Sequence, residues 1–145
     1  MSATAGSAGS QRTLADRLAI LAGMVVQEVG FDSDCDEELR AAIVERTGTD
    51  MLGEDSDEVV DVVLLWFRSD DGDLVDTLVD SLAPLAANGV IWLLTPKAGH
   101  DGHVEPSDVG EAAPTAGLSQ TSSISAGPDW SGTRLVTPKS SRSKR

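Results

Sequence analysis

The chain has 145 residues, of which 40% are hydrophobic, and a formal net charge of -13 at pH 7. This length fits one domain with a modest core, and no apolar stretch is long enough to cross a membrane as a helix. So negative a chain repels phosphates, which makes nucleic acid an unexpected ligand for the body of the domain.

Both ends of the chain are predicted to be disordered tails around a single α/β domain at residues 13–136. Residues 1–12 are mainly Ala, Gly, Ser and Thr and lack the hydrophobic region of a secretory signal. Residues 137–145 are basic, and no acidic residue follows Asp129. We expect this end to be a solubilising tail; the alternative is a weak, salt-sensitive contact with nucleic acid, as in a transcription-linked factor.

The first elements predicted are a short helix over residues 13–22 and a strand over residues 24–29. The leucines of the helix share one side, and Gly23 ends it. Gln27 and Glu28 interrupt the apolar run of the strand, which indicates an end or edge position in a sheet.

A second helix is predicted over residues 35–47, after a turn at residues 30–34. Gly48 is expected to end this helix in a left-handed conformation. Four acids crowd its first turn, where the helix dipole stabilises negative charge: Asp34, Asp36, Glu37 and Glu38. An acidic loop with a brief extended piece then fills residues 50–57.

The most informative stretch predicts two strands, over residues 59–67 and 90–95, joined by a helix over residues 71–88. Both strands are almost continuously apolar, which is typical of parallel strands covered on both faces. The helix is expected to begin at Asp70 or Asp71, to stop at Asn88 and Gly89, and to bend or restart at Pro84. Together they form a right-handed strand–helix–strand crossover with parallel neighbouring strands.

The last third predicts a polar loop, a helix that starts at Pro106, and two strands. The helix is expected to end at residues 114–117. A weak strand over residues 118–126 precedes a stronger one over residues 130–136.

Few residues form a pattern that carries chemistry. Cys35 is the only cysteine, which excludes an intramolecular disulfide and favours a reducing cytoplasm; neighbouring carboxylates are expected to disfavour its thiolate. His100 and His103 are interpreted as solvated loop residues, since a structural zinc site needs four ligands. The acidic run at residues 32–38 lacks the glycine of a calcium-binding loop. We therefore expect no catalytic residue, no metal and no cofactor.

Several segments resemble a family of small, acidic, uncharacterised actinobacterial proteins, a domain-of-unknown-function family. They are DVVLLW, GVIWLLTPK, HVEPSD, EAAPTAGL and DWSGTRLV, and the resemblance covers residues 13–139. It implies a shared shape and no known activity.

The order of elements from Asp61 onward also resembles the C-terminal half of Rossmann-like, class I S-adenosylmethionine-dependent methyltransferases. This resemblance implies a small Rossmann-like three-layer α/β fold, shortened relative to that family, with a mostly parallel sheet and an antiparallel C-terminal strand. The family wraps its cofactor in a glycine-rich loop after a strand. The counterpart here, QEVGFDSD, keeps Gly30 but has Asp32 and Asp34 where further glycines are expected, which implies a relative without cofactor.

Two functions follow as hypotheses. The first is a non-enzymatic regulatory or interaction protein of the cytoplasm that meets a partner with a basic surface through an acidic face, formed by Asp34, Asp36, Glu37, Glu38, Asp73, Asp76 and Asp80. The alternative is a small ligand-binding protein or enzyme, a degenerate methyltransferase-like domain. Its pocket lies where the parallel strands end, since open α/β sheets bind ligands there, and includes Arg68, Ser69, Thr95, Lys97 and His100. Lys97 and Arg68 would meet an anion.

Overall fold

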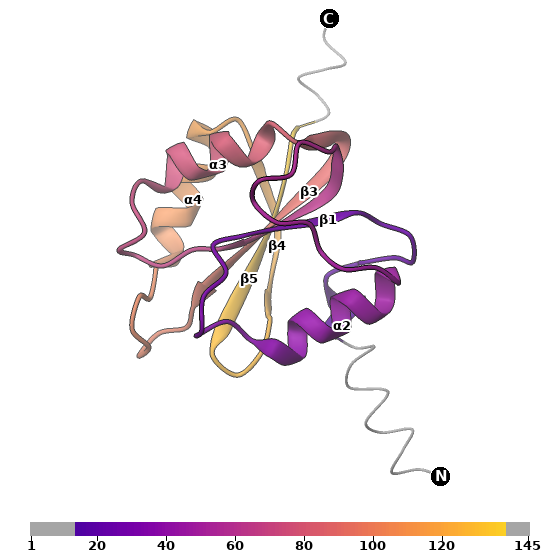
Figure 1. The fold of residues 1–145 in the computed structure, drawn as a ribbon. Helices are drawn as coiled ribbons and strands as arrows, with labels where there is room; N and C mark the ends of the chain where they lie inside the picture. Colours follow the sequence, from indigo (N-terminus) through magenta and orange to yellow (C-terminus); the bar gives the residue numbers. More distant parts are fainter. Residues whose placement is uncertain (1–13, 139–145) are drawn as a thin grey trace, which may run out of the picture.

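A single five-stranded sheet with helices on both faces organises the protein (Figure 1). The structure is a computed structural model that describes residues 14–138. Its elements are β1 (Val26–Val29), α2 (Glu37–Thr47), β2 (Val60–Trp66), α3 (Leu74–Leu82), β3 (Leu85–Pro96), α4 (Pro106–Thr115), β4 (Ser119–Ser125) and β5 (Trp130–Val136). The tails predicted at residues 1–12 and 137–145 lie outside the described residues, apart from Thr137 and Pro138.

The strands follow the order β1-β2-β3-β5-β4, and β1, β2 and β3 are parallel. β5 runs antiparallel to both β3 and β4. The mostly parallel sheet with an antiparallel C-terminal strand is thus confirmed, as are the crossover between β2 and β3 and the edge position of β1.

Successive residues of β2 point into two different cores. Val62, Leu64 and Trp66 pack on the side of α2, in a cluster that also holds Leu18, Ile20, Leu39 and Ile43. Val63 and Leu65 pack on the opposite side, in a cluster with residues of α3 and α4. A strand covered on both faces is apolar along most of its length, here at every position except Asp61, which explains why its sequence does not alternate.

The start and end of α2 follow from local chemistry. Asp36 is the N-cap residue, and its carboxylate accepts a hydrogen bond from the Leu39 N–H at 2.9 Å. Gly48 ends the helix with φ 86°, as predicted. The helix therefore begins at Glu37, two residues later than expected.

The prediction of a helix over residues 71–88 is wrong at both ends, since α3 spans Leu74–Leu82. α3 starts after Asp73, which caps it by accepting from the Asp76 N–H at 3.0 Å, so Asp70 and Asp71 lie outside it. It ends before Pro84, whose carbonyl accepts from the Val60 N–H at 2.8 Å. This bond brings the chain into the sheet, so Asn88 lies in β3 and terminates no helix. Hydrogen bonds to β2 therefore determine the structure from Leu85 onward, although the apolar residues there continue the helical spacing.

The helix predicted over residues 13–22 is also shorter than expected. Helical backbone covers residues 14–17, and Ala19 then takes a left-handed conformation with φ 56°. Leu21, expected to face inward, is 58% exposed, while Ile20 is fully buried. The break turns the chain, so the helical spacing no longer sets which side chains face the core.

The C-terminal elements agree closely with expectation. α4 begins at Pro106, and β5 spans the predicted residues 130–136. Pro114 lies inside the last turn of α4 and does not end it. Among residues 14–138, no helix is long and apolar enough to cross a membrane.

Candidate functional site

The carboxyl ends of β1 and β2 meet at one edge of the sheet, and Arg68 lies at their junction. Its guanidinium donates to both carboxylate oxygens of Asp34, with Nη2 2.6 Å from Oδ1 and Nε 2.9 Å from Oδ2. Nη1 donates to the Gly30 carbonyl at 3.0 Å and to the Asp71 carboxylate at 3.1 Å. We call these four residues the Arg68 cluster.

The Arg68 cluster is held by charge as well as by geometry. The Arg68 side chain is 12% exposed and that of Asp34 is 52% exposed. The hydrogen bond from Arg68 lowers the pKa of the Asp34 carboxyl below its usual value, and the same bond raises the pKa of Arg68. The guanidinium also lies 5.4 Å from the ring centroid of Trp130, in cation–π contact. The guanidinium of Arg68 therefore has hydrogen-bond partners along its edges and an aromatic ring against its face.

The turn after β1 is packed against the protein itself. Gly30 has φ 81°, and a Cβ at this position would collide with the Trp66 carbonyl oxygen. The Trp130 indole Nε1 donates to the Asp34 carbonyl at 3.1 Å. The glycine is thus required by close approach to β2, whereas a cofactor-binding loop would need it for close approach to a ligand.

S-adenosylmethionine, the cofactor of the methyltransferases that the chain resembles, does not fit this turn. The carbonyl of Gly30 is taken by Arg68, and the carboxylates of Asp32 and Asp34 follow at once. Asp34 and Arg68 are bonded to each other at this turn. The residues present thus bind one another where the family binds its cofactor.

A buried carboxylate that the sequence analysis did not single out lies behind this edge. Glu28 in β1 is 8% exposed and accepts from the Trp66 indole Nε1 at 2.9 Å. It also pairs with Arg40 of α2, with Oε2 2.6 Å from Nε and Oε1 2.8 Å from Nη2. The indole of Trp66 meets that of Trp130 edge to face, with centroids 4.8 Å apart. The signal in the sequence was one acidic residue, Glu28, within the strand predicted over residues 24–29.

The residues predicted to line one anion pocket are separated in the structure. Thr95 and Lys97 line a pocket of about 390 Å³ between the start of α4 and the β4–β5 hairpin, together with His103. We call it the α4 pocket. Arg68 belongs to its own cluster, the Ser69 N–H donates to the Gly102 carbonyl, and His100 lies 3.5 Å from the Asp129 carboxylate.

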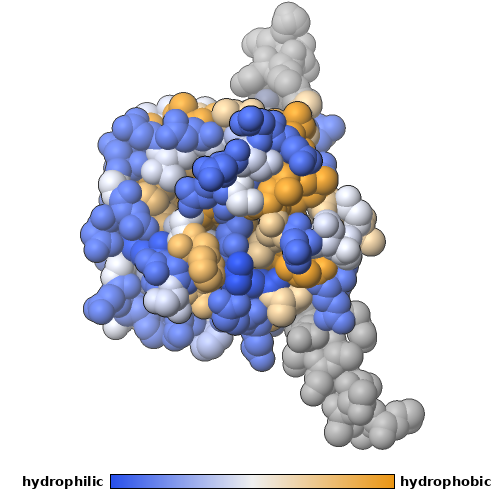
Figure 2. Space-filling view, viewed as in Figure 1, coloured by the Kyte–Doolittle hydropathy of each residue, from blue (hydrophilic) through white to orange (hydrophobic). Residues whose placement is uncertain are grey.

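The predicted acidic face is divided between two sides of the sheet, because α2 and α3 cover opposite faces (Figure 1). Near α2, Asp34 and Glu37 pair with arginines and Asp36 caps the helix, which leaves Glu38 exposed. On α3, Asp73 is the cap. Figure 2 shows the mainly hydrophilic surface over both helices.

On α3, Asp76 and Asp80 remain exposed, and Asp80 shares a hollow with the acidic loop. The hollow has a volume of about 530 Å³ and is lined by Asp80, Glu54 and Asp57 with Gln27 and Thr77. We call it the acidic hollow. Acids from two separate segments thus line one hollow.

Cys35 and the histidines form no reactive constellation. Cys35 is buried, and burial raises the pKa of its thiol to about 11, with the neighbouring Asp34 carboxylate a lesser cause than expected. Within residues 14–138, no three His, Cys, Asp or Glu side chains gather in a way that would hold a metal ion.

Comparison with known proteins relates the chain to a family and to a fold. The family model described as "Protein of unknown function (DUF3052)" matches residues 15–139. An uncharacterised protein of Mycobacterium tuberculosis strain H37Rv is 56% identical over 131 residues, which cover 90% of this chain and 82% of that protein. An uncharacterised Mycobacterium bovis protein matches equally well. Both findings confirm the resemblance to an actinobacterial family.

Solved structures of methyltransferases share the fold at low sequence identity. A SAM-dependent methyltransferase from Aquifex aeolicus superposes with a TM-score of 0.58 at 14% identity, over 88% of this chain and 89% of that one. A putative sarcosine dimethylglycine methyltransferase from Galdieria sulphuraria gives a TM-score of 0.62 at 10% identity, over 90% and 86%. The Rossmann-like, methyltransferase-like fold is thereby confirmed.

Proposed function

The chain belongs to the DUF3052 family, and we propose that it is a non-enzymatic regulatory or protein-interaction domain of the cytoplasm that binds a basic partner. The observation that carries this proposal is the Arg68 cluster. Open α/β sheets bind ligands at the carboxyl ends of their strands, and here the ends of β1 and β2 are closed by bonds between Arg68, Asp34 and Gly30. The fold is kept while its usual cofactor-binding edge is used for internal packing.

The acidic hollow supports the choice of partner. Glu54, Asp57 and Asp80 line it from a loop and a helix. Glu54 Oε2 accepts from the Gly30 N–H at 2.7 Å, and none of the three acids pairs with a basic side chain among residues 14–138. Because these acids have no basic partner, the hollow would attract a lysine or arginine of another protein. The affinity of such a contact should fall as salt rises.

The cytoplasmic location is proposed from the single cysteine. Cys35 is buried and cannot form a disulfide within the chain. A small domain without disulfides suits a reducing compartment.

The partner proposal is tested by affinity capture from an extract of the native host at low and high salt. A triple variant, Glu54→Gln with Asp57→Asn and Asp80→Asn, removes the acids of the hollow. A matched control, Asp101→Asn with Asp108→Asn and Glu111→Gln, removes the same charge from exposed positions elsewhere. We expect a basic protein to be captured at low salt, released at high salt, lost with the first variant and kept with the control. Equal capture by both variants would contradict the proposal.

The non-enzymatic part is tested separately by calorimetric titration with S-adenosylmethionine. We expect no heat of binding, because Arg68 and Asp34 bond to each other and to the Gly30 carbonyl at the turn that corresponds to the cofactor loop. Saturable binding at micromolar concentration would overturn this part while leaving the acidic hollow untouched.

A further inference from the structure

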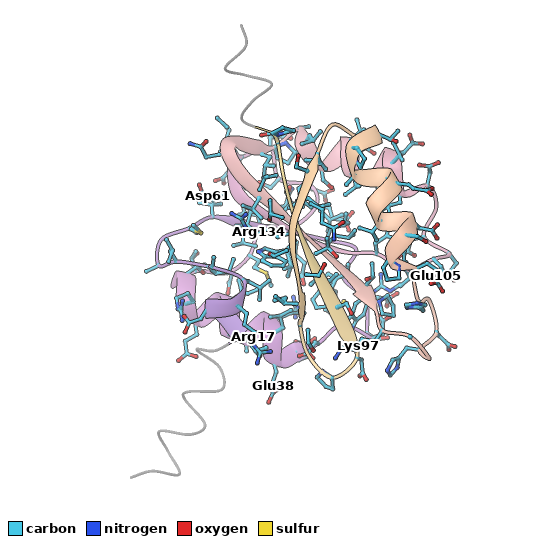
Figure 3. All side chains as sticks on the ribbon, turned by 180° about the vertical axis from the view of Figure 1, so that it is seen from behind. Arg17, Glu38, Asp61, Lys97, Glu105 and Arg134 are labelled. Carbon is cyan, nitrogen blue, oxygen red and sulfur yellow. The ribbon has the colours of Figure 1, made fainter. Side chains whose placement is uncertain are left out.

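The α4 pocket has the features of a binding site that the proposed function does not use. It opens beside the β4–β5 hairpin, on the side of the molecule seen in Figure 3, where Lys97 and Glu105 are labelled. Its volume of about 390 Å³ is at the low end of the range of about 300–1,000 Å³ that small-molecule sites occupy. A compact ligand is therefore the right size.

Lys97 gives this pocket its charge. Arg40, Arg46 and Arg68 each pair with a carboxylate, as expected in so acidic a chain. The ammonium of Lys97 donates instead to the Ser125 hydroxyl at 2.7 Å, and it pairs with no carboxylate among residues 14–138. A half-buried cation held by a neutral hydroxyl keeps two of its three donors for a ligand.

The other polar groups that line the pocket include no carboxylate, and the Glu105 carboxylate lies outside the lining, 3.6 Å from His103 Nε2. The Pro96 carbonyl, which can only accept, lies 2.9 Å from His103 Nδ1, so that nitrogen carries the hydrogen. The hydroxyls of Thr95, Ser125 and Ser131 also line the pocket. One ammonium among hydroxyl, amide and imidazole groups, with no Asp or Glu in the lining, matches a single negative charge.

Apolar side chains complete the lining. Val104 and Val109 come from the α4 side. A ligand with an apolar carbon skeleton would gain from contact with them at roughly 25 cal/mol per Å² buried.

We propose that the α4 pocket binds a small organic monocarboxylate, with its carboxylate at Lys97 and its skeleton against Val104 and Val109. A phosphate monoester matches less well, because its dianion is usually bound by an arginine fork or by several cations, and the pocket offers one ammonium. The proposal does not depend on the acidic hollow, which lies at the opposite edge of the sheet, beside β1.

The test is a titration of the whole chain followed by amide NMR shifts, with benzoate and isovalerate as probes. Benzamide has the shape of benzoate without its charge, and phenyl phosphate supplies the dianion. We expect saturable shifts at Lys97, Ser125 and the first turn of α4 with both carboxylates, and at least about tenfold weaker binding of benzamide and of phenyl phosphate.

Two variants separate the pocket charge from net charge. Lys97→Gln should weaken benzoate binding at least about tenfold. Arg134→Gln removes the same charge from β5 outside the pocket and should leave binding unchanged. The proposal is overturned if neither carboxylate shifts these amides, if benzamide or phenyl phosphate binds as tightly, or if both variants behave alike. If Lys97→Gln does not fold, the comparison of benzoate with benzamide on the unmodified chain still tests the proposal.

Discussion

Arg68 and Asp34 form a two-point ion pair that joins the turn after β1 to the second residue after β2, with a shortest N–O distance of 2.6 Å. The pair lies where open α/β sheets bind their ligands. Because the same guanidinium also holds the Gly30 carbonyl and the Asp71 carboxylate, this edge is part of the folded framework. Substitutions there should therefore be measurable as changes in stability.

Arg68→Ala is expected to lower the free energy of unfolding by about 2 kcal/mol. The value lies between the cost of breaking a buried pair and that of an exposed one, because Arg68 is nearly buried while Asp34 is half exposed. Urea unfolding measures it. Arg17→Ala is the control, since Arg17 makes an exposed bond to the Ser125 carbonyl. Equal losses for the two variants would mean that the Arg68 cluster contributes nothing specific.

The pH dependence of this pair has a definite sign. The Arg68 hydrogen bond lowers the pKa of Asp34 from its usual value of 3.8, so the charged carboxylate is favoured in the folded state. Its contribution is complete above that value and is lost as pH falls through the lowered folded pKa. Asp34→Asn should therefore cost up to about 1 kcal/mol near neutral pH and progressively less below about pH 4. Urea unfolding across that range checks it; a constant difference would contradict it.

Gly30→Ala should be far more costly than Gly48→Ala, although both glycines have a left-handed backbone. At Gly48, with φ 86°, a Cβ meets nothing within 4 Å, so alanine costs about 1 kcal/mol of backbone strain. At Gly30 the Cβ also collides with the Trp66 carbonyl, which raises the expected cost to about 3 kcal/mol. Thermal unfolding of the two variants measures the difference. Similar melting temperatures would show that β1 and β2 can separate at this point without loss.

Cys35 should react slowly with thiol reagents in the folded protein. Burial raises the pKa of its thiol to about 11, so only a small fraction is thiolate near neutral pH. The rate of modification by a disulfide reagent should rise about tenfold per pH unit through the range below that pKa. The same measurement in urea, where the thiol is solvated, is the control. A fast reaction that is independent of pH would mean that the cysteine is exposed and activated.

The fold was predictable where hydrophobic patterning and strand pairing agree. Residues 59–67 and 130–136 are read correctly because their apolar character matches burial in β2 and β5. Residues 83–89 mislead because the spacing of Leu82 and Leu85 continues the helical pattern, while the Pro84 carbonyl pairs with β2. Local spacing does not reveal which backbone groups bond to a distant strand.

The candidate site was predictable in place but not in composition. The crossover alone predicts where the parallel strands end, and Thr95 and Lys97 line a pocket at that end of the sheet. That Arg68 turns toward Asp34 and away from this pocket depends on a contact 34 residues away in sequence. The division of the acidic residues between two faces likewise depends on which side of the sheet each helix packs against.

Glu28 provides the sharpest test of the buried network, because it shares Arg40 with the exposed Glu37. Removing Glu28 leaves the Trp66 indole N–H and the Arg40 guanidinium without their buried acceptor, so Glu28→Ala should cost about 3 kcal/mol. Glu37→Ala removes a partner of the same arginine from a position where water replaces it, and should cost less than about 1 kcal/mol.

Urea unfolding gives both values, and the NMR signal of the Trp66 indole proton reports the local change. This signal should move in Glu28→Ala and stay in place in Glu37→Ala, since only Glu28 accepts from the indole. If both variants lose the same free energy, or if the indole signal is unmoved by the loss of Glu28, the carboxylate does not hold β1, β2 and α2 together as its contacts indicate.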